Sequence, residues 1–464
     1  MPKRVLICTL STAIALLASG CASLTHTRYT APELPVATSF DATPLGVRAA
    51  QGGQWWNTFD DPRLTALVDQ VLARNANLAA AGLTLKQARM SAALARQGLF
   101  PSGSASASSS ASKALDGGTP WSKSSSGSLN ASWELDLFGK LSAQADASSW
   151  TAKATEQDLA STRLSLIATT AEAWWQLGYA NEQITIGADS IAYVRRLLDL
   201  VNKQYAAGAI SRIDVRDAEQ TVASQEAAQT QLIQARVQAI KTLAALLNQQ
   251  DYTGEDIKTL PTQDLPTIAP GLPASLLSRR PDLAAAELRL RSTLATSDAT
   301  AASYYPSLSL TGSLGSSSTG LLGFLSNPFA SLGAAISVAE LNPEKIRLGI
   351  GVARADYDIA VQNFRQTFYD ALRDTQTALS ERDQYILQAT SLEQNYTAAR
   401  AAEVLYDRRY RAGYITLRDL LDAQNRTRTA LSSLVQNRYN RLVSQVQVYE
   451  ALGGDTATGG GAVQ

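Results

Sequence analysis

The sequence predicts an α+β membrane protein whose chains share a β-barrel that continues into a barrel of long helices. Three observations favour this fold class: a tandem repeat, four stretches that alternate small or apolar with polar residues, and two very long segments without proline. A chain of 464 residues would form about three domains if it consisted of compact globules. The repeat instead divides the chain into two copies of one elongated unit.

The N-terminus predicts secretion and a lipid anchor. Two basic residues precede an apolar run over residues 5–18, and small residues then lead directly to Cys21. This order is typical of a secretory signal peptide, and the cysteine at its end resembles a bacterial lipobox. We therefore expect Cys21 to become the mature N-terminus and to carry N-palmitoyl and S-diacylglycerol lipid, with ordinary signal cleavage as the alternative. Ala22, rather than an aspartate, follows Cys21. This resembles the rule that sorts lipidated proteins to the outer membrane.

The composition excludes several kinds of site and partner. Acidic and basic side chains number 41 each, so no excess of positive charge points to nucleic acid. The other cysteine, Cys8, lies inside the predicted signal peptide, which leaves the mature chain without an internal disulfide. No later run of about 18 apolar residues follows, so we expect no transmembrane helix, and any entry into a membrane should use strands.

The repeat has a constant offset of 205 residues. The stretch "RNANLAAAGLTLK" from Arg74 aligns with "RRPDLAAAELRLR" from Arg279, and "YAAGAIS" from Tyr205 aligns with "YRAGYIT" from Tyr410. The offset holds without a gap over roughly 170 residues, which an Ala-rich composition alone does not produce. Since solenoid repeats span only about 20 to 50 residues, each copy should contain several elements.

Two stretches in each copy predict β-strands. Small or apolar residues alternate with mostly serine over 102–111 and 129–137, and again over 307–314 and 332–338. The pattern is typical of a membrane barrel with lipid outside and water inside, and four half-buried strands of a soluble sheet are the alternative. The serine-rich face and the lipobox favour the barrel. Because even a filled barrel needs about eight strands, several chains must share it.

Long helices should follow each strand pair. No proline occurs from Gly139 to Ala207 or from Lys345 to Ala412, and at 1.5 Å per residue each helix would reach roughly 100 Å. Apolar residues recur in steps of four and three, which predicts coiled-coil packing. Return helices are expected over 213–247 and 417–452. A single helix over 64–99 should supply the missing length by stacking end to end on a return helix.

Each long helix should end in a hairpin tip that points away from the membrane. Gly208 and Gly413 are expected to adopt the left-handed conformation that commonly ends a helix. Ser211 with Asp214, and Thr416 with Asp419, then predict capping boxes for the return helices.

Four motifs resemble one known family. They are "WWNTFDDPRLTALVDQVLARNANL" from Trp55, "SWELDLFGK" from Ser132, "GLPASLLSRRPDLAAAE" from Gly271 and "YRAGYITLRDLLDAQ" from Tyr410. In order and coverage they resemble the TolC-like outer-membrane factors, and among these the lipidated OprM-like (NodT-type) lipoproteins of tripartite RND pumps. The resemblance implies a homotrimer with a twelve-stranded outer-membrane β-barrel continuous with a twelve-helix periplasmic barrel. It also implies a periplasmic membrane-fusion adaptor and an inner-membrane RND-type pump as partners.

The predicted organisation follows from the repeat and the resemblance. Its segments are a signal peptide (1–20), a lipid-anchored extended segment (21–63), helical barrel (64–100), a membrane β-hairpin (101–138), helical barrel with a tip near 208 (139–249), a Pro-rich linker (250–280), helical barrel (281–305), a second membrane β-hairpin (306–340), helical barrel with a tip near 413 (341–452) and a flexible tail (453–464).

Two departures from the family pattern concern a junction and a tip. The counterpart of "DLFGK" usually resembles an aromatic-Asp-Gly-Gly-Arg turn, whereas this chain has "ELNPEK" from Glu340. Some relatives carry acidic residues directly after the tip glycine, whereas this chain has Tyr414 and Ile415 there. We therefore expect a local difference at the barrel-to-helix junction, and the charged residues of the tip lie further along the helix.

Several conspicuous residues have simple structural interpretations. We expect His26, the only histidine, to be a solvated linker residue rather than a catalyst. The "RRPD" motif suggests an anion site, but Pro281 and Asp282 also suit the first turn of a helix. Trp55 and Trp56 should pack the N-terminal segment rather than bind a ligand. We therefore expect no enzyme, no catalytic or metal site, and no cofactor besides the lipid.

The expected function is passive: an exit duct for drugs and other small toxic molecules, opened when adaptor and pump engage the tips. Charge pairs between helices, involving Arg212, Asp214, Arg418 and Asp419, would hold the closed state. Alternatives are a duct for type I protein secretion or for metal efflux, and a lipid-anchored periplasmic scaffold without a pore. The residues expected to serve gating and adaptor docking are Gly208, Arg212, Asp214, Asp217, Gly413, Arg418, Asp419 and Asp422.

Overall fold

The computed structural model describes residues 26–34, 54–114, 120–263, 265, 279–319 and 327–454. The expected signal peptide, Cys21 and all but the first two residues of the expected tail lie outside these residues. The chain forms two compact units: unit 1 comprises Met1–Leu34, Leu83–Asp158 and Asp282–Thr367, and unit 2 comprises Pro35–Gly82, Leu159–Pro281 and Phe368–Gln464.

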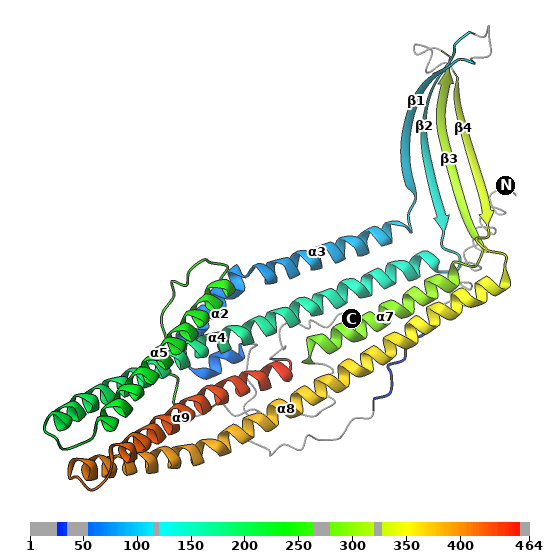
Figure 1. Ribbon diagram of the computed structural model, residues 1–464. Coiled ribbons are helices and arrows are strands. Elements are labelled where there is room, and N and C mark those ends of the chain that lie inside the picture. Colours follow the sequence, from blue (N-terminus) through cyan, green and yellow to red (C-terminus); the bar gives the residue numbers. More distant parts are fainter. Residues whose placement is uncertain are drawn as a thin grey trace. The chain divides into compact units, whose positions relative to one another are not determined.

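The described residues are mostly helical with one small antiparallel sheet, as the sequence predicted (Figure 1). The first copy contains η2 (Trp55–Phe59), α2 (Pro62–Arg74), α3 (Ala76–Gln97), β1 (Ser102–Ser112), β2 (Ser122–Leu135), α4 (Lys140–Ala206) and α5 (Arg212–Leu246). The second copy contains α7 (Pro281–Ala302), β3 (Ser307–Ser318), β4 (Pro328–Ser337), α8 (Pro343–Arg411) and α9 (Leu417–Ala451). Within the described ranges, no helix combines the length and hydrophobicity that a membrane span requires.

The proline-free segments form uninterrupted helices of nearly equal length. Helix α4 has 67 residues and α8 has 69, whereas the return helices α5 and α9 have 35 residues each. The predicted pairing of one long helix with a return helix of about half its length is therefore confirmed in both copies.

The expected single helix over 64–99 is wrong, because the chain breaks at Asn75 into α2 and α3. The side-chain oxygen of Asn75 accepts a hydrogen bond from the Leu78 N–H (3.1 Å), which caps the start of α3. Its amide nitrogen donates to the Leu246 carbonyl at the end of α5 (2.9 Å). The end of α5 therefore meets the start of α3, and the expected end-to-end stacking is confirmed at this joint.

The same joint recurs in the second copy with a different side chain. Arg280 lies 205 residues after Asn75, and its guanidinium donates to the Ala451 carbonyl at the end of α9 (Nη1–O 3.1 Å). Carbonyls at a helix C-terminus lack intrahelical donors and carry partial negative charge, so a cation suits this position. Pro281 begins α7, with Asp282 in its first turn. The helix-start interpretation of "RRPD" is therefore confirmed.

The strands form one sheet in the order β1-β2-β3-β4, with all neighbours antiparallel (Figure 1). One face carries most of the serines, and opposed hydroxyls hydrogen-bond across the strands, as in Ser106–Ser128 (2.9 Å) and Ser307–Ser337 (2.8 Å). The other face is mostly apolar, and its Leu332 and Ile336 are 94% and 74% exposed in the single chain, although Ser109 and Ser125 form a hydroxyl pair on it as well (3.1 Å). The sheet thus presents a polar wall and an apolar wall, as the alternation predicted.

Phe329 breaks the alternation. The strand register places it on the serine face, opposite Gly315, where it is the only large apolar residue among the described strands. Its ring lies over Gly315, since a Cβ added to that glycine would come within 2.6 Å of the ring's Cζ and 3.0 Å of the Gly127 carbonyl oxygen. Gly315 therefore provides the space that the ring occupies.

One ion pair and three other contacts between helices fix the order of helices in unit 1. Arg89 of α3 pairs with Glu156 of α4 (3.1 Å), and the hydroxyls of Thr151 in α4 and Ser292 in α7 lie 2.9 Å apart. Ser292 also donates to the Ala147 carbonyl of α4 (2.8 Å), and the Tyr304 hydroxyl after α7 lies against Gly349 of α8. The helices of unit 1 therefore follow the order α3-α4-α7-α8, and α3 and α8 are the two outer helices.

Exposed apolar residues follow both outer helices. In α3 they are Leu83, Met90 and Leu94, which are 66%, 56% and 72% exposed. In α8 they are Leu348, Val352 and Ile359, which are 54%, 62% and 58% exposed. Steps of seven and four residues place each set on one face of its helix.

The two strand-to-helix junctions differ, as expected from "ELNPEK". In the first copy, Gly139 adopts a positive φ of 74°, and both carboxylate oxygens of Asp136 accept N–H groups from the first turn of α4 (2.9 and 2.8 Å). In the second copy, Asn342 accepts the Glu344 N–H (3.0 Å) at the start of α8. An asparagine cap before Pro343 therefore replaces the glycine turn.

Within unit 2, aromatic side chains pack the segment before α2 against α4 and α9. Trp55 and Trp56 are each 1% exposed, Trp55 stacks on Tyr449 of α9 (4.9 Å between ring centroids), and Phe59 packs edge-on against Trp175 of α4 (4.7 Å). The predicted packing role of the tryptophan pair is confirmed.

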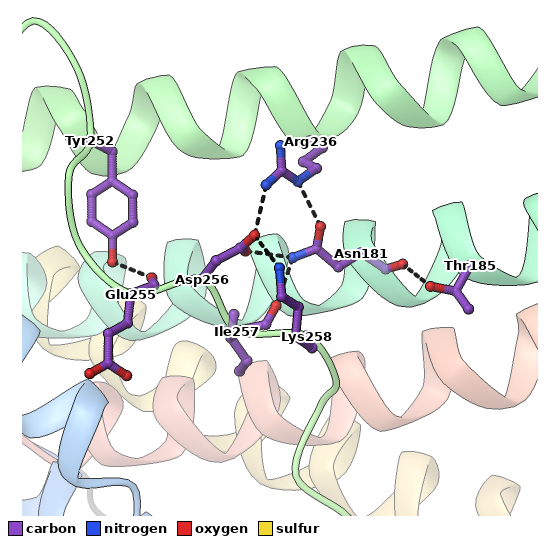
Figure 2. A network of polar contacts seen from close by, with 8 residues as sticks. All are labelled: Asn181, Thr185, Arg236, Tyr252, Glu255, Asp256, Ile257 and Lys258. Atoms are coloured by element: carbon purple, nitrogen blue, oxygen red, sulfur yellow. Dashed lines mark hydrogen bonds and ion pairs between the residues drawn. The ribbon is translucent and has the colours of Figure 1, made fainter.

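The linker after α5 is fastened by a polar network, drawn in Figure 2. Asp256 of the linker accepts hydrogen bonds from Asn181 of α4 (2.8 Å), Arg236 of α5 (2.7 Å) and Lys258 (2.8 Å). Burial raises the pKa of Asp256, but these three hydrogen bonds outweigh it, so the pKa lies below its ordinary value. The network ties α4, α5 and the linker together.

We predict that Gly315→Ala destabilises the sheet by about 1–3 kcal/mol, because the new methyl group overpacks against the Phe329 ring. Gly312→Ala is the matched control, since a Cβ there meets Leu332 at an ordinary 3.5 Å. Thermal unfolding of the detergent-solubilised protein, followed by the strand signal in circular dichroism, measures the difference. Phe329→Ala in the Gly315→Ala background should recover part of the loss, because it removes the ring contact but leaves the close approach to the Gly127 carbonyl oxygen. Equal effects of both glycine substitutions would contradict this packing.

Candidate gate at the helical hairpin tips

The two hairpin tips have the same backbone structure. Gly208 has a φ of 75° and Gly413 a φ of 76°, a left-handed conformation that glycine adopts without strain. In the first tip, the Gly208 N–H donates to the Tyr205 carbonyl and the Ala209 N–H to the Gln204 carbonyl, both at 2.9 Å. The second tip has the equivalent pair of bonds at 2.9 and 3.0 Å. This pattern is a Schellman motif, and the predicted helix ends are confirmed.

Capping boxes begin both return helices. The Ser211 hydroxyl and N–H donate to the Asp214 carboxylate (2.8 and 3.0 Å), and Thr416 does the same with Asp419 (2.6 and 3.0 Å). The side chain and then the backbone of Thr416 lower the pKa of Asp419 from its ordinary value. A lowered carboxyl pKa stabilises the cap above the unfolded-state pKa, and this contribution disappears as the pH falls through the folded-state value.

The remaining charged residues of the predicted gate lie on the first turns after the tips. Arg212, Arg418 and Asp422 are exposed, and Asp217 is half-buried. Among the described residues, the salt bridges nearest the tips lie within single helices, as in Arg216–Glu219 and Arg411–Asp407. Further from the first tip, Arg195 of α4 pairs with Glu226 of α5 (2.5 Å).

The expected charge pairs between helices do not form within one chain. Across the described ranges, no salt bridge joins Arg212 or Arg418 to Asp214 or Asp419. Both aspartates instead accept the hydrogen bonds of their own capping boxes.

An apolar cluster, defined by residues of all four helix ends, connects the two hairpins. It contains Leu197 and Val201 of α4, Val215 and Ala218 of α5, Tyr410 of α8, and Leu417 and Leu420 of α9. Tyr410 is 7% exposed, and its hydroxyl donates to the Gln204 side chain of α4 (2.8 Å). Its counterpart in the first copy, Tyr205, is 42% exposed. The repeat equates these tyrosines, so sequence comparison carried no signal that only one of them joins the hairpins.

Buried polar contacts continue the connection between hairpins further along the helices. Gln424 of α9 donates to the Ser190 hydroxyl of α4 (2.6 Å), which in turn donates to Gln225 of α5 (2.5 Å). Ser432 of α9 donates to Gln183 of α4 (2.7 Å). Ser190, Gln424 and Gln183 are 5–6% exposed. The α4–α9 contact is therefore held by specific hydrogen bonds rather than by apolar packing alone, and the sequence analysis did not identify it.

A groove of about 510 Å³ lies between α8 and α9 on the second hairpin. Small residues form much of its lining, including Ala399, Ala402, Ala423 and Ala430. The guanidinium of Arg426 lies 5.9 Å from the Tyr406 ring at this groove. Small side chains let another helix approach closely, so the groove suits a helical partner.

We predict that Tyr410→Phe destabilises the contact between the hairpins by about 1 kcal/mol, because Gln204 loses its hydrogen-bond partner in a buried site. Tyr205→Phe is the internal control and should change stability by less than half as much. Chemical unfolding of the detergent-solubilised protein measures both variants. Equal losses for both substitutions would show that the Tyr410 hydroxyl has no special role.

The described residues hold no group of three or more His, Cys, Asp or Glu side chains arranged to bind a metal ion.

Comparison with known proteins gives a consistent result. The family described as "Outer membrane efflux protein" matches residues 67–249 and again residues 272–454. The second match begins and ends 205 residues after the first, which confirms the tandem repeat.

Individual proteins resemble the chain over most of their length. Toxin and drug export protein A of Aggregatibacter actinomycetemcomitans is 31% identical, over 86% of this chain and 88% of that protein. The pyoverdine export outer membrane protein OpmQ of Pseudomonas aeruginosa is 31% identical, over 86% and 87%. The solved structure of the outer-membrane channel OprN superposes with a TM-score of 0.83 at 29% identity, over 93% of this chain and 99% of that one. The chain belongs to the outer membrane efflux protein family and is an outer-membrane channel component of an efflux system.

Proposed function

We propose that three copies of the chain form a passive exit duct for drugs and other small toxic molecules. The duct would combine a twelve-stranded outer-membrane barrel with a twelve-helix periplasmic barrel. A periplasmic membrane-fusion adaptor and an inner-membrane RND-type pump would deliver the molecules and supply the energy. The observation that carries this proposal is the open-edged sheet with one polar and one apolar wall.

The sheet supports a shared barrel because both of its outer strands are paired on one side only. Among the described strands, β1 pairs with β2 and β4 pairs with β3, and neither has a second neighbour. Each unsatisfied backbone group in lipid costs several kcal/mol, so the edges need partners. Pairing β4 of one chain with β1 of the next satisfies both edges, and three chains then supply twelve strands.

The outer helices of unit 1 support the same arrangement. The exposed apolar faces of α3 and α8 would pack against each other between neighbouring chains, as α8 of one chain meets α3 of the next. This contact joins two different surfaces, so it cannot form a two-fold dimer, and it gives a ring when the rotation between neighbours closes. Strand pairing at the sheet edges and packing of the helix faces would therefore both join each chain to the same neighbour around one axis.

The polar wall supports transport of varied molecules without a dedicated binding site. Its hydroxyls hydrogen-bond to one another, as in Ser108–Ser126 (2.9 Å) and Ser313–Ser331 (2.6 Å). A wall of this kind offers water-compatible groups but few charges. The names of the similar proteins mention export of drugs and of pyoverdine, which favours small-molecule export, and export of a toxin, which is compatible with protein secretion as well. Protein secretion and metal efflux are the alternatives.

Lipid on Cys21 would anchor the chain in the outer membrane beside the barrel. The hairpin tips and the groove between α8 and α9 would receive the adaptor. Gly208 and Gly413 would shape the tips, while Arg212, Asp214, Asp217, Arg418, Asp419 and Asp422 would form the charged contacts that close the aperture between chains.

Deletion of the gene and complementation test which class of molecule is exported. Loss of the gene should increase susceptibility to several unrelated antibiotics and detergents, and the wild-type gene should restore resistance. A panel that includes copper and silver salts and a secreted-protein assay separates the alternatives. Unchanged susceptibility to every drug, with loss of one secreted protein or of metal tolerance, would overturn small-molecule export.

We predict that the double substitution Asp214→Ala and Asp419→Ala raises the open probability of the purified protein in planar bilayers several-fold. Exposed ion pairs contribute about 0–1 kcal/mol each, so several must be removed together. The matched control is Ser211→Ala with Thr416→Ala, which breaks the same capping boxes and keeps both carboxylates. An equal rise in both double variants would assign the effect to the helix caps rather than to charges at the aperture.

A further inference from the structure

The N-terminal segment 26–34 contacts a buried carboxylate of α7. Asp298 is 6% exposed. The Thr27 N–H donates to one of its oxygens (2.8 Å) and the Thr27 hydroxyl to the other (2.7 Å). The His26 ring nitrogen Nδ1 lies 3.5 Å from the first oxygen. A buried carboxylate without partners is costly, and hydrogen bonds to an ionised group are stronger than neutral ones, so Thr27 satisfies a group that otherwise disfavours folding.

A second set of contacts holds the segment two residues later. The Tyr29 hydroxyl donates to Glu287 of α7 (3.3 Å), and Arg291 pairs with the same carboxylate (2.7 Å). The Arg291 guanidinium lies 4.6 Å from the Tyr29 ring and 5.3 Å from the Trp150 ring of α4. Burial, and then the negative charge of Glu287, raise the pKa of Tyr29 to about 12. The phenol therefore remains a donor at any physiological pH.

Thr27, Tyr29, Arg291 and Asp298 line a cavity of about 420 Å³ in unit 1. Its lining combines the segment itself with α4 and α7, including Asp146, Trp150 and Leu294. The segment is thus held by charged groups at its two contacts, beside a cavity that Trp150, Leu294 and Asp146 help to line.

The repeat shows that the side chains of this α4–α7 surface have no counterparts at the equivalent positions of α3 and α8. At the equivalent positions of α3, the first copy has Ala93 for Asp298, Gly82 for Glu287 and Lys86 for Arg291. The position equivalent to Trp150 is Ala355 in α8. The fold alone therefore does not require these side chains, and the equivalent surface offers neither a carboxylate nor an aromatic ring.

We propose that Asp298, Glu287 and Arg291 form a recognition site for the chain's own segment 26–29, which seats the anchor end of the chain on α7 and not on α3. Its consequence for membrane attachment rests on the proposed lipidation of Cys21. Thr27 lies six residues after Cys21, which is roughly 20 Å of fully extended chain. The site then limits the distance between the lipid anchor and Asp298 to that length.

Tryptic cleavage after Arg28 in the detergent-purified full-length chain tests the site. Asp298→Ala should speed this cleavage about tenfold, because the two hydrogen bonds from Thr27 to the Asp298 side chain are lost. Thr27→Val leaves α7 unchanged and removes only the hydroxyl contact, so it should speed cleavage about threefold and does not depend on how α7 tolerates a substitution. Asp146→Ala removes a carboxylate from the same cavity wall and should leave the rate unchanged.

The proposal is overturned if Arg28 is cut at the wild-type rate in both the Asp298 and the Thr27 variants. It is also overturned if Asp146→Ala accelerates cleavage as much as they do. The mass of the N-terminal peptide reports lipidation separately. A chain without lipid that still shows faster cleavage in Asp298→Ala would refute the anchor and retain the recognition site.

Discussion

The structure depends on one constraint: backbone groups at the edge of a sheet in lipid must find hydrogen-bond partners. A single chain leaves the outer sides of β1 and β4 without neighbouring strands in the described sheet, so it cannot complete a barrel alone. The other features are consistent with this requirement. In the proposed trimer, the exposed faces of α3 and α8 would contact the same neighbouring chains, and the ring of strands would enclose the serine wall around water.

The tandem repeat acts as an internal comparison of two solutions to one structural problem. The two copies have the same residue types where the backbone conformation requires them. Both tips have a glycine in the left-handed conformation and an aspartate in the capping box. The copies differ at positions where a side chain makes a particular charged or polar contact. Asn75 and Arg280 both bind the end of a return helix, but only the latter brings a positive charge, and Asp298 has no acidic counterpart in the first copy. Departures between the copies therefore locate functions that the fold does not demand.

Local patterns predicted most of the fold, whereas contacts between distant residues were missed. Alternation specified the strands, absence of proline specified the long helices, and glycine with a capping box specified the tips. The break at Asn75 was missed because asparagine is tolerated within helices, and its partner, the Leu246 carbonyl, is 171 residues away. The burial of Tyr410 and the contact between Thr27 and Asp298 were missed for the same reason. A charged or aromatic residue in one copy opposite alanine or glycine in the other would have been a usable signal for Asp298.

In the proposed duct, the distribution of contact strength within unit 2 favours opening at the tips of the hairpins. Burying a side chain such as Leu417 or Leu420 contributes about 1.5–3 kcal/mol, and both are almost fully buried in the cluster that joins the hairpins. Exposed charges at the first turns contribute at most about 1 kcal/mol per pair. In the proposed duct, a partner bound at the tips would therefore replace weak contacts between chains with its own contacts. The hairpins of one chain stay joined meanwhile, because separating them would expose Tyr410 and leave the carboxamide of Gln424 without its partner Ser190.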